Sequence, residues 1–169
     1  MGLGMVTAVE PLNVKVAEFS DYLAIESAWW RLLDDQQRHD SRGPLSSLQT
    51  PYNLERVRRF LESRIRQGRI VVAYFNDELA GISTFAPDGF ILDSPVKVWE
   101  ISDVWVEPHA RRKGIASALV NFCEHECLMR GASEVRLTVY SQNEAAMGLY
   151  ESLGYCSNSF TLSRRISKD

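Results

Sequence analysis

One stretch constrains the fold of this chain more than any other, and it has the sequence VWEISDVWVEPHARRKGIASAL between Val98 and Leu119. Hydrophobic and β-branched residues dominate positions 98–106, and Glu107-Pro108 ends that run. A helical pattern begins directly after Gly114. The order predicts a strand, a basic turn and the first turn of a helix.

A turn of this kind predicts a binding site for an anion. The first N–H groups of a helix have no intrahelical partner, and the helix dipole adds roughly half a positive charge there. Gly114 permits a close backbone approach, and Arg111, Arg112 and Lys113 add positive charge. We expect a loop that fits a pyrophosphate, although a merely solvated basic turn is the alternative. The sequence contains neither a Walker G-x-x-x-x-G-K-[ST] pattern nor a G-x-G-x-x-G fingerprint.

Two motifs carry a resemblance to a known family. Arg111-x-x-Gly114-x-Ala116 resembles motif A of the GNAT superfamily of acyl-CoA-dependent N-acyltransferases, whose pattern is Q/R-x-x-G-x-G/A. Downstream, residues 143–155 resemble motif B of the same superfamily, N-x-x-A-x-x-x-Y-x-x-x-G-[FY]. The two motifs stand in the family's order, so together they are more specific than either alone. The resemblance is close in the C-terminal part of the chain and holds only in outline before it.

The patterns and the resemblance together predict an α/β chain with the three-layer α/β/α GNAT fold. Its sheet is expected to be mixed and mostly antiparallel, with a central splayed strand. We expect one domain over residues 1–169, with an acyl-CoA-binding core at about 96–156. Expected strands lie at 14–19, 70–75, 79–86, 98–106, 134–140 and 157–165, and expected helices at 21–36, 53–67, 114–130 and 144–153.

Two local details of the N-terminal half are also predicted. Leu23, Trp30 and Leu33 are expected to line the buried face of the first helix, and Asn53 to cap the second. In the family, the region after the first helix overlies the acceptor pocket. The resemblance therefore places Trp29 and Trp30, with the 38–50 loop, near the substrate; core packing is the alternative for the tryptophans.

Composition limits the class of protein. The net charge of −3 argues against a dedicated nucleic-acid binder. No apolar run is long enough for a membrane span, and the N-terminus lacks a signal-peptide pattern, so a cytoplasmic location is expected. Cys123 and Cys127 lack the further ligands that a metal site needs, so we expect buried thiols and no metal.

The resemblance implies how acetyl-CoA, the expected co-substrate, is held. Backbone amides of the turn take the pyrophosphate, and the exposed peptide groups of the splayed strand pair with the pantetheine arm. One such amide is the candidate oxyanion donor, typically worth about 3–4 kcal/mol of barrier. Asn143 matches a position that contacts the pantetheine. The full expected cofactor set is Val104, Trp105, Val106, Arg111, Arg112, Lys113, Gly114, Ile115, Ala116, Ser117, Asn143 and Tyr150.

Two catalytic roles are also implied. An aliphatic amine with a pKa near 10 is mostly protonated at pH 7, so a base must take its proton. Glu100 matches the position of a catalytic glutamate in several members, with Asp103 or a water chain as alternatives and an ion-pair role open for both carboxylates. In a regular strand Glu100 would share a face with Val104 and Val106, a parity that a bulge would change. Tyr150 stands where motif B places the acid that protonates the thiolate.

The sequence thus predicts an N-acetyltransferase acting on a primary amine of a small molecule or a peptide. The alternative is a GNAT-like module that binds acyl-CoA without catalysis, as a sensor or interaction partner. No nucleic-acid or membrane partner is expected. A homodimer is a further expectation, since many relatives dimerise through C-terminal strands. Phe160, Leu162 and Ile166 would serve such an interface or else complete the core.

Overall fold

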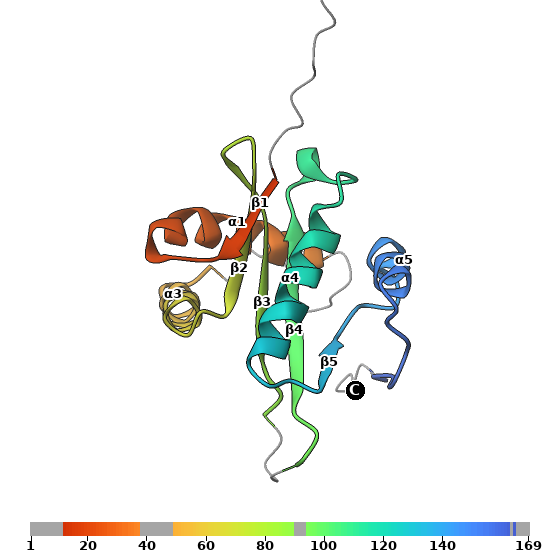
Figure 1. Ribbon diagram of the computed structural model, residues 1–169. Coiled ribbons are helices and arrows are strands. Elements are labelled where there is room, and N and C mark those ends of the chain that lie inside the picture. Colours follow the sequence, from red (N-terminus) through yellow and green to blue (C-terminus); the bar gives the residue numbers. More distant parts are fainter. Residues whose placement is uncertain (1–11, 38–48, 90–93, 163, 165–169) are drawn as a thin grey trace, which may run out of the picture. The chain divides into compact units, whose positions relative to one another are not determined.

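The computed structural model describes residues 12–37, 49–89, 94–162 and 164 (Figure 1). By its internal contacts the chain forms two compact units, residues 1–138 and 139–169. The first contains β1 (Leu12–Val16), η1 (Phe19–Asp21), α1 (Tyr22–Gln36), α3 (Pro51–Arg66), β2 (Ile70–Phe75), β3 (Glu78–Pro87), β4 (Val98–Val106), η2 (Pro108–Ala110), α4 (Ile115–Met129) and β5 (Glu134–Leu137). The second contains α5 (Glu144–Ser152). The single domain expected over the whole chain stays a prediction.

The five strands form one mixed sheet in the order β1-β2-β3-β4-β5. The first four are antiparallel neighbours, and β5 pairs in parallel with β4. A parallel pair needs a crossover connection, which α4 supplies here. Asn76 and Asp77, both at positive φ, make the tight β2–β3 hairpin turn that the sequence predicts.

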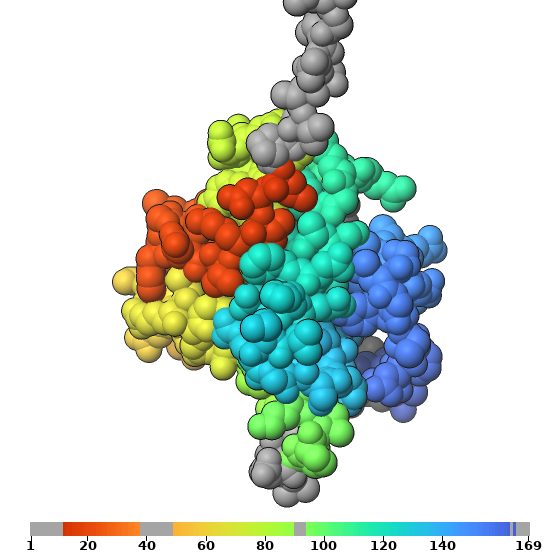
Figure 2. Space-filling model, viewed as in Figure 1, coloured from red at the N-terminus to blue at the C-terminus, as the bar shows by residue number. Residues whose placement is uncertain are grey.

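Helices cover both faces of this sheet, as expected for three layers. The α1–α3 face carries Ile70, Val72 and Ile82 in one buried cluster with the apolar sides of both helices. Figure 2 shows the atoms of α1 and α3 lying side by side. The opposite face receives α4, which lies against β3 and β4 in Figure 1. The approach is close at Gly81, where a Cβ would lie 3.0 Å from Leu119 Cδ1.

The central strand β4 contains a bulge, and its pairing with β5 ends just before that bulge. Ile82 pairs with Trp105 and Thr84 with Ser102, so β4 has one more residue than β3 between these pairs. Asp103, within the bulge, has a φ of +55°. Within the described residues, β5 pairs with β4 only as far as Ile101. The splayed central strand of the predicted fold is therefore present.

Three local predictions are wrong. The final strand expected at 157–165 is absent from its described residues, 157–162 and 164. Thr50 rather than Asn53 caps α3, because Thr50 Oγ1 accepts a hydrogen bond from Asn53 N–H at 3.3 Å. Leu23 is 77% exposed, since α1 turns a different side toward the sheet. The residues that α1 buries are Ile25, Ala28, Trp29 and Leu32.

The expected burial of the two α4 cysteines is confirmed. Cys123 and Cys127 are both free and buried, whereas Cys156 is exposed. Burial raises the pKa of Cys123 to about 12 and that of Cys127 to about 11, so both remain thiols at neutral pH. No helix among the described residues combines the length and the apolar character that crossing a membrane requires.

Candidate functional site

The backbone between β4 and α4 forms an uncapped helix N-terminus. Arg112 has a φ of +64° and Gly114, the N-cap residue, a φ of +78°. No side chain among the described residues caps α4, and a Cβ on Gly114 would meet nothing within 4 Å. The first N–H groups of α4 are thus open to an anion, as the sequence predicts.

The basic side chains of this turn do not all face outward. Arg111 Nε donates to the carbonyl oxygen of Val106 at 3.0 Å, and its guanidinium lies 4.7 Å from the ring centroid of Trp105. Lys113 Nζ lies 4.4 Å from the ring centroid of Phe75. Of the three, only Arg112 makes no side-chain hydrogen bond, ion pair or ring contact with the described parts of the protein. An anion at the turn would therefore meet backbone N–H groups and the Arg112 side chain.

Beyond the bulge, β4 offers peptide groups on its open side. Glu107 N–H donates to the Ala80 carbonyl at 2.9 Å, so Glu107 directs its amide toward β3. Hydrogen bonding alternates along an antiparallel strand, so Trp105 also faces β3 while Val106 directs its peptide groups away. Arg111 occupies the Val106 carbonyl, which leaves the Val106 N–H on that side, and Val104, within the bulge, pairs with neither β3 nor β5 in the described residues. Trp105, 5% exposed, belongs to the α1–α3 core instead.

The two candidate carboxylates of β4 have different environments. Glu100 Oε1 accepts a hydrogen bond from Thr138 Oγ1 at 3.2 Å, and Asp103 Oδ2 accepts one from Thr84 Oγ1 at 2.6 Å. Burial raises the pKa of Asp103, the hydrogen bond from Thr84 and the charge of Arg64 lower it, and the charge of Glu100 raises it further. The net effect is a pKa of Asp103 above the usual aspartate value, so Asp103 is a stronger base than an ordinary exposed aspartate.

The bulge decides which side chains share a face with Glu100. Glu100 pairs with Ala86, in phase with Ile82 of the α1–α3 face. Val106 pairs with Gly81, which faces α4. Glu100 therefore shares a face with Trp105 and not with Val106, which differs from the regular-strand expectation because the extra residue reverses the parity.

In the second unit, Asn143 directly precedes α5 and Tyr150 lies on it. Asn143 Oδ1 accepts a hydrogen bond from Ala146 N–H at 3.2 Å and so caps the helix. Tyr150 is buried, with its ring 6.0 Å from that of Tyr155 in an edge-on arrangement. Burial raises the pKa of Tyr150 to about 12, which keeps its hydroxyl protonated at neutral pH.

The α1 tryptophans and the following loop were expected near the substrate, and the structure describes the tryptophans but not most of the loop. Trp29 is 8% exposed and packs against Phe60 with ring centroids 5.0 Å apart, so it is a core residue. Trp30 is half-buried. Residues 38–48 of the predicted acceptor loop lie outside the described residues.

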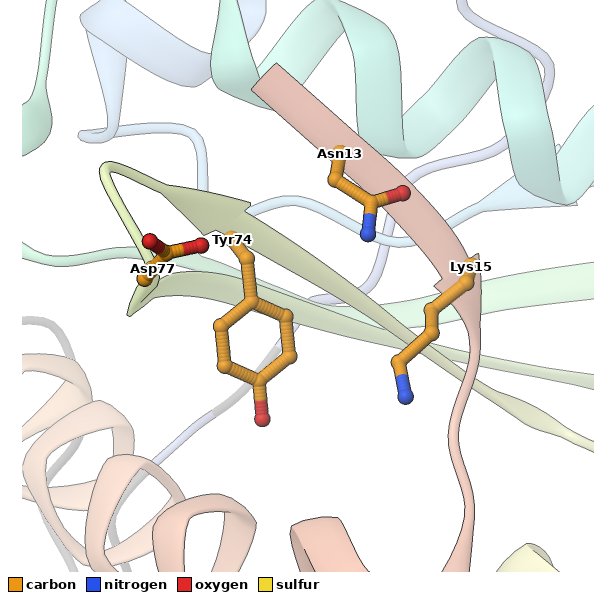
Figure 3. A pocket seen from close by; sticks show the side chains of 4 residues that line it. All are labelled: Asn13, Lys15, Tyr74 and Asp77. Carbon is orange, nitrogen blue, oxygen red and sulfur yellow. The ribbon is translucent and has the colours of Figure 1, made fainter. Parts of the chain in front are cut away.

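A separate polar recess of about 490 Å³ is lined by Asn13, Lys15, Tyr74 and Asp77 (Figure 3). Tyr74 Oη donates to Asp21 Oδ1 at 2.6 Å, and Lys15 Nζ lies 3.2 Å from Asp21 Oδ2. Burial acts to raise the pKa of Asp21, but these contacts and the Glu18 N–H lower it overall. Tyr74 and Lys15 thus already satisfy a buried carboxylate, and the recess belongs to β1 and β2 rather than to the splayed strand.

One ion pair near the turn was not predicted from the sequence. Glu107 is 6% exposed, and Arg31 of α1 holds its carboxylate from Nε (3.0 and 3.1 Å) and from Nη2 (2.6 Å). The indole N–H of Trp105 donates to the same carboxylate at 3.4 Å. The two partners are distant in sequence and match no motif, so no local signal pointed to the pair.

Known proteins share both this fold and its sequence pattern. The chain matches the profile of the acetyltransferase (GNAT) family over residues 26–155. A putative acetyl transferase from Pyrococcus furiosus is 27% identical, with a TM-score of 0.65, and the match covers 92% of this chain and all of that one.

Two further solved structures are similar in fold. An aminoglycoside N-acetyltransferase in complex with CoA is 14% identical with a TM-score of 0.69, covering 96% of this chain and 99% of that one. A predicted acetyltransferase with acetyl-CoA from Clostridium acetobutylicum is 18% identical with a TM-score of 0.67, covering 92% and 96%. With most of its length matched by the family profile, and with the splayed strand and uncapped helix described above, this chain belongs to the acetyltransferase (GNAT) family.

Proposed function

We propose that this protein is an N-acetyltransferase that moves an acetyl group from acetyl-CoA to a primary amine. The observation that carries the proposal is the location of the non-glycine residues with a strained, positive φ. The described residues contain four non-glycine residues at positive φ, two of them in the β2–β3 hairpin turn. The other two are Asp103, in the bulge, and Arg112, in the turn. Such strain persists where the surroundings enforce it, often at functional sites.

The residues present fit an acyl-CoA. The N–H groups of residues 112–117 and the Arg112 side chain suit a pyrophosphate, since α4 begins there without a cap. The peptide groups of Val104 and the N–H of Val106 suit an extended amide-containing arm, because no strand pairs with them in the described residues. Bound there, acetyl-CoA would supply the thioester, and the Val106 N–H is the candidate donor to its carbonyl oxygen.

A carboxylate of β4, Glu100 or Asp103, takes the proton that the ammonium form of the acceptor must lose. The free amine then forms the new N–C bond while the C–S bond breaks, and the nitrogen releases its second proton to solvent. We retain Glu100 as a candidate base, and the raised pKa of Asp103 makes that residue its strongest competitor. A water chain to either carboxylate would serve the same purpose.

Tyr150 supplies the proton that the departing thiolate requires. Its raised pKa, about 12, supports a hydroxyl that stays protonated until sulfur becomes basic beside it. A Tyr150→Phe variant is expected to bind acetyl-CoA with unchanged affinity while its kcat falls about 10²–10⁴-fold. Undiminished turnover in that variant would remove Tyr150 from the reaction.

The acceptor is proposed to be an amine of a small molecule or a peptide, in the cytoplasm. The carboxylates of Glu100 and Asp103 on one strand support a cationic acceptor. A homodimer through the C-terminal segment is part of the proposal, supported by Phe160 and Leu162, which are 85% and 94% exposed. The alternative, an acyl-CoA-binding module without turnover, would show binding but no acetylated product with any amine.

The experiment is thermal unfolding with and without acetyl-CoA, followed by a panel of amines. A ligand at 100 times its dissociation constant adds about 2.7 kcal/mol to the free energy of unfolding, which raises the melting temperature by roughly 5–10 °C. The shift should vanish in an Arg112→Glu/Gly114→Glu double variant and persist in Arg59→Glu, an exposed arginine on α3. No shift for the wild type at saturating acetyl-CoA would refute the proposed function.

A further inference from the structure

A set of four charged residues ties α1 to the segment that follows the splayed strand. We name Arg31, Asp35, Glu107 and Arg111 the α1 clamp. Arg31 and Asp35 stand four residues apart, one turn of α1, and so do Glu107 and Arg111 at the two ends of the segment around η2. The same side of α1 therefore meets both ends of that segment.

The first contact of the clamp is a two-pronged ion pair. The Arg31 guanidinium reaches both oxygens of Glu107, and its Nη1 donates to Ser27 Oγ at 2.7 Å, which fixes its orientation on α1. A planar guanidinium paired in this way restricts direction as well as distance. Because the Glu107 side chain is only 8% exposed, removing Arg31 would leave a buried carboxylate without its cation.

The second contact reaches the backbone of the strand itself. Arg111 Nη2 lies 3.7 Å from Asp35 Oδ2, while Arg111 Nε donates to the Val106 carbonyl. An ion pair this exposed contributes little to stability by itself. Its effect is geometric, since it holds a carbonyl on the side of β4 where β5 no longer pairs.

This end of β4 is therefore held in place by β3 on one side and by α1 on the other. The peptide groups of Val104 and Val106 must be fixed in space to bind a ligand without an ordering cost. The turn at 112–117 begins directly after Arg111, so its place depends on the same contacts.

We propose that Arg31 and Glu107 are positioning residues for acyl-CoA, which act through the splayed end of β4 and the turn after it. This inference rests on the proposed function, because it assumes that acyl-CoA binds there. Neither residue needs to touch the ligand. Their loss should weaken acetyl-CoA binding in protein that is still folded.

The test measures the dissociation constant of acetyl-CoA by calorimetry, well below the melting temperature, for Arg31→Met, Glu107→Gln and the double variant. Each single variant should bind on the order of tenfold or more weakly, as small displacements in a binding site can cost up to about a hundredfold. The double variant should bind no more weakly than the worse single variant, because both changes break one contact. Arg59→Met, which breaks the exposed Arg59–Glu55 pair (2.7 Å), is the matched control and should bind like the wild type.

Several outcomes would overturn the inference. If folded variants bind acetyl-CoA as the wild type does, or lose only melting temperature, the pair is structural and positions nothing. If the effects of the two changes add, the residues act separately. Glu107→Gln keeps the side chain's shape, so it gives a reading even if Arg31→Met does not fold. If the wild type itself does not bind acetyl-CoA, the proposed function fails first, and that result is distinct from the others.

Discussion

A single methyl group added at Gly81 should weaken both the fold and the candidate site. A Cβ there would lie 2.7 Å from the Trp105 carbonyl oxygen, 3.0 Å from Leu119 Cδ1 and 3.4 Å from Ile115 Cγ2. Ordinary contacts begin near 3.4 Å, so the Trp105 oxygen would have to move by several tenths of an ångström. The Leu119 methyl can rotate away, but the oxygen belongs to the backbone of β4 and cannot move alone.

The expected cost for Gly81→Ala follows from this geometry. Overpacking by one methyl typically costs about 1–3 kcal/mol, and the loss of glycine's freedom in the unfolded chain returns about 0.4–1 kcal/mol. A net loss of roughly 1–2 kcal/mol lowers the melting temperature by about 2–8 °C in a chain of this size. The displacement of β4 and of the first turn of α4 should also weaken acetyl-CoA binding.

The assay is urea unfolding of Gly81→Ala beside Gly89→Ala. Gly89 is the matched control, because a Cβ there meets no atom of the described residues within 4 Å. Its substitution should change the free energy of unfolding by less than about 0.5 kcal/mol. An unfolding midpoint for Gly81→Ala equal to or above that of the wild type would show that β4 and α4 can separate freely, which would refute the packing argument.

Three other predictions concern stability and reactivity. Asp103→Asn should be more stable than the wild type at pH 7. Because the pKa of Asp103 is raised in the folded state, the wild type loses stability as the pH rises above 3.8, the pKa in the unfolded chain. In denaturation curves, the stability difference between variant and wild type should therefore shrink as the pH is lowered toward 3.8. Thr50→Ala should lose about 1 kcal/mol by removing the α3 cap, and an unchanged melting temperature would contradict the assignment. Native alkylation followed by mass spectrometry should label Cys156 and spare Cys123 and Cys127, and rapid labelling of either α4 cysteine would contradict their burial.

The sequence predicted best those parts of the fold whose boundaries are marked by proline or glycine. Pro108 and Gly114 bound the turn between β4 and α4, because proline fixes its φ and glycine permits the positive φ that the turn needs, wherever the rest of the chain lies. Motif spacing then identified the family before any contact was known. The choice of Asn53 as a cap went wrong because two residue types of similar capping strength stand close together.

The errors concern what depends on the three-dimensional neighbourhood. A short β-type pattern at 157–165 carries no information about whether an adjacent strand is there to pair with it. The buried side of α1 was misjudged because Leu23 fits a helical stripe as well as Ile25 does. That Arg31 meets Glu107, and that Arg111 meets Asp35, depends on contacts across many residues of intervening chain. Local pattern cannot contain such contacts.

The bulge in β4 implies that this chain is one residue longer than its sheet requires. If Asp103 were deleted, Ser102 and Trp105 could keep their partners Thr84 and Ile82 with a single residue between them on each strand, as in an ordinary antiparallel ladder. Every side chain on either side would stay on its present face. The shortened protein should then fold into a more regular sheet without the positive-φ strain at Asp103, yet lose the divergence at which we place the pantetheine arm of acyl-CoA. Deletion of one residue would thus preserve the fold while it removes the proposed acyl-CoA site. Selection for activity would reject that change, and selection for stability alone would accept it.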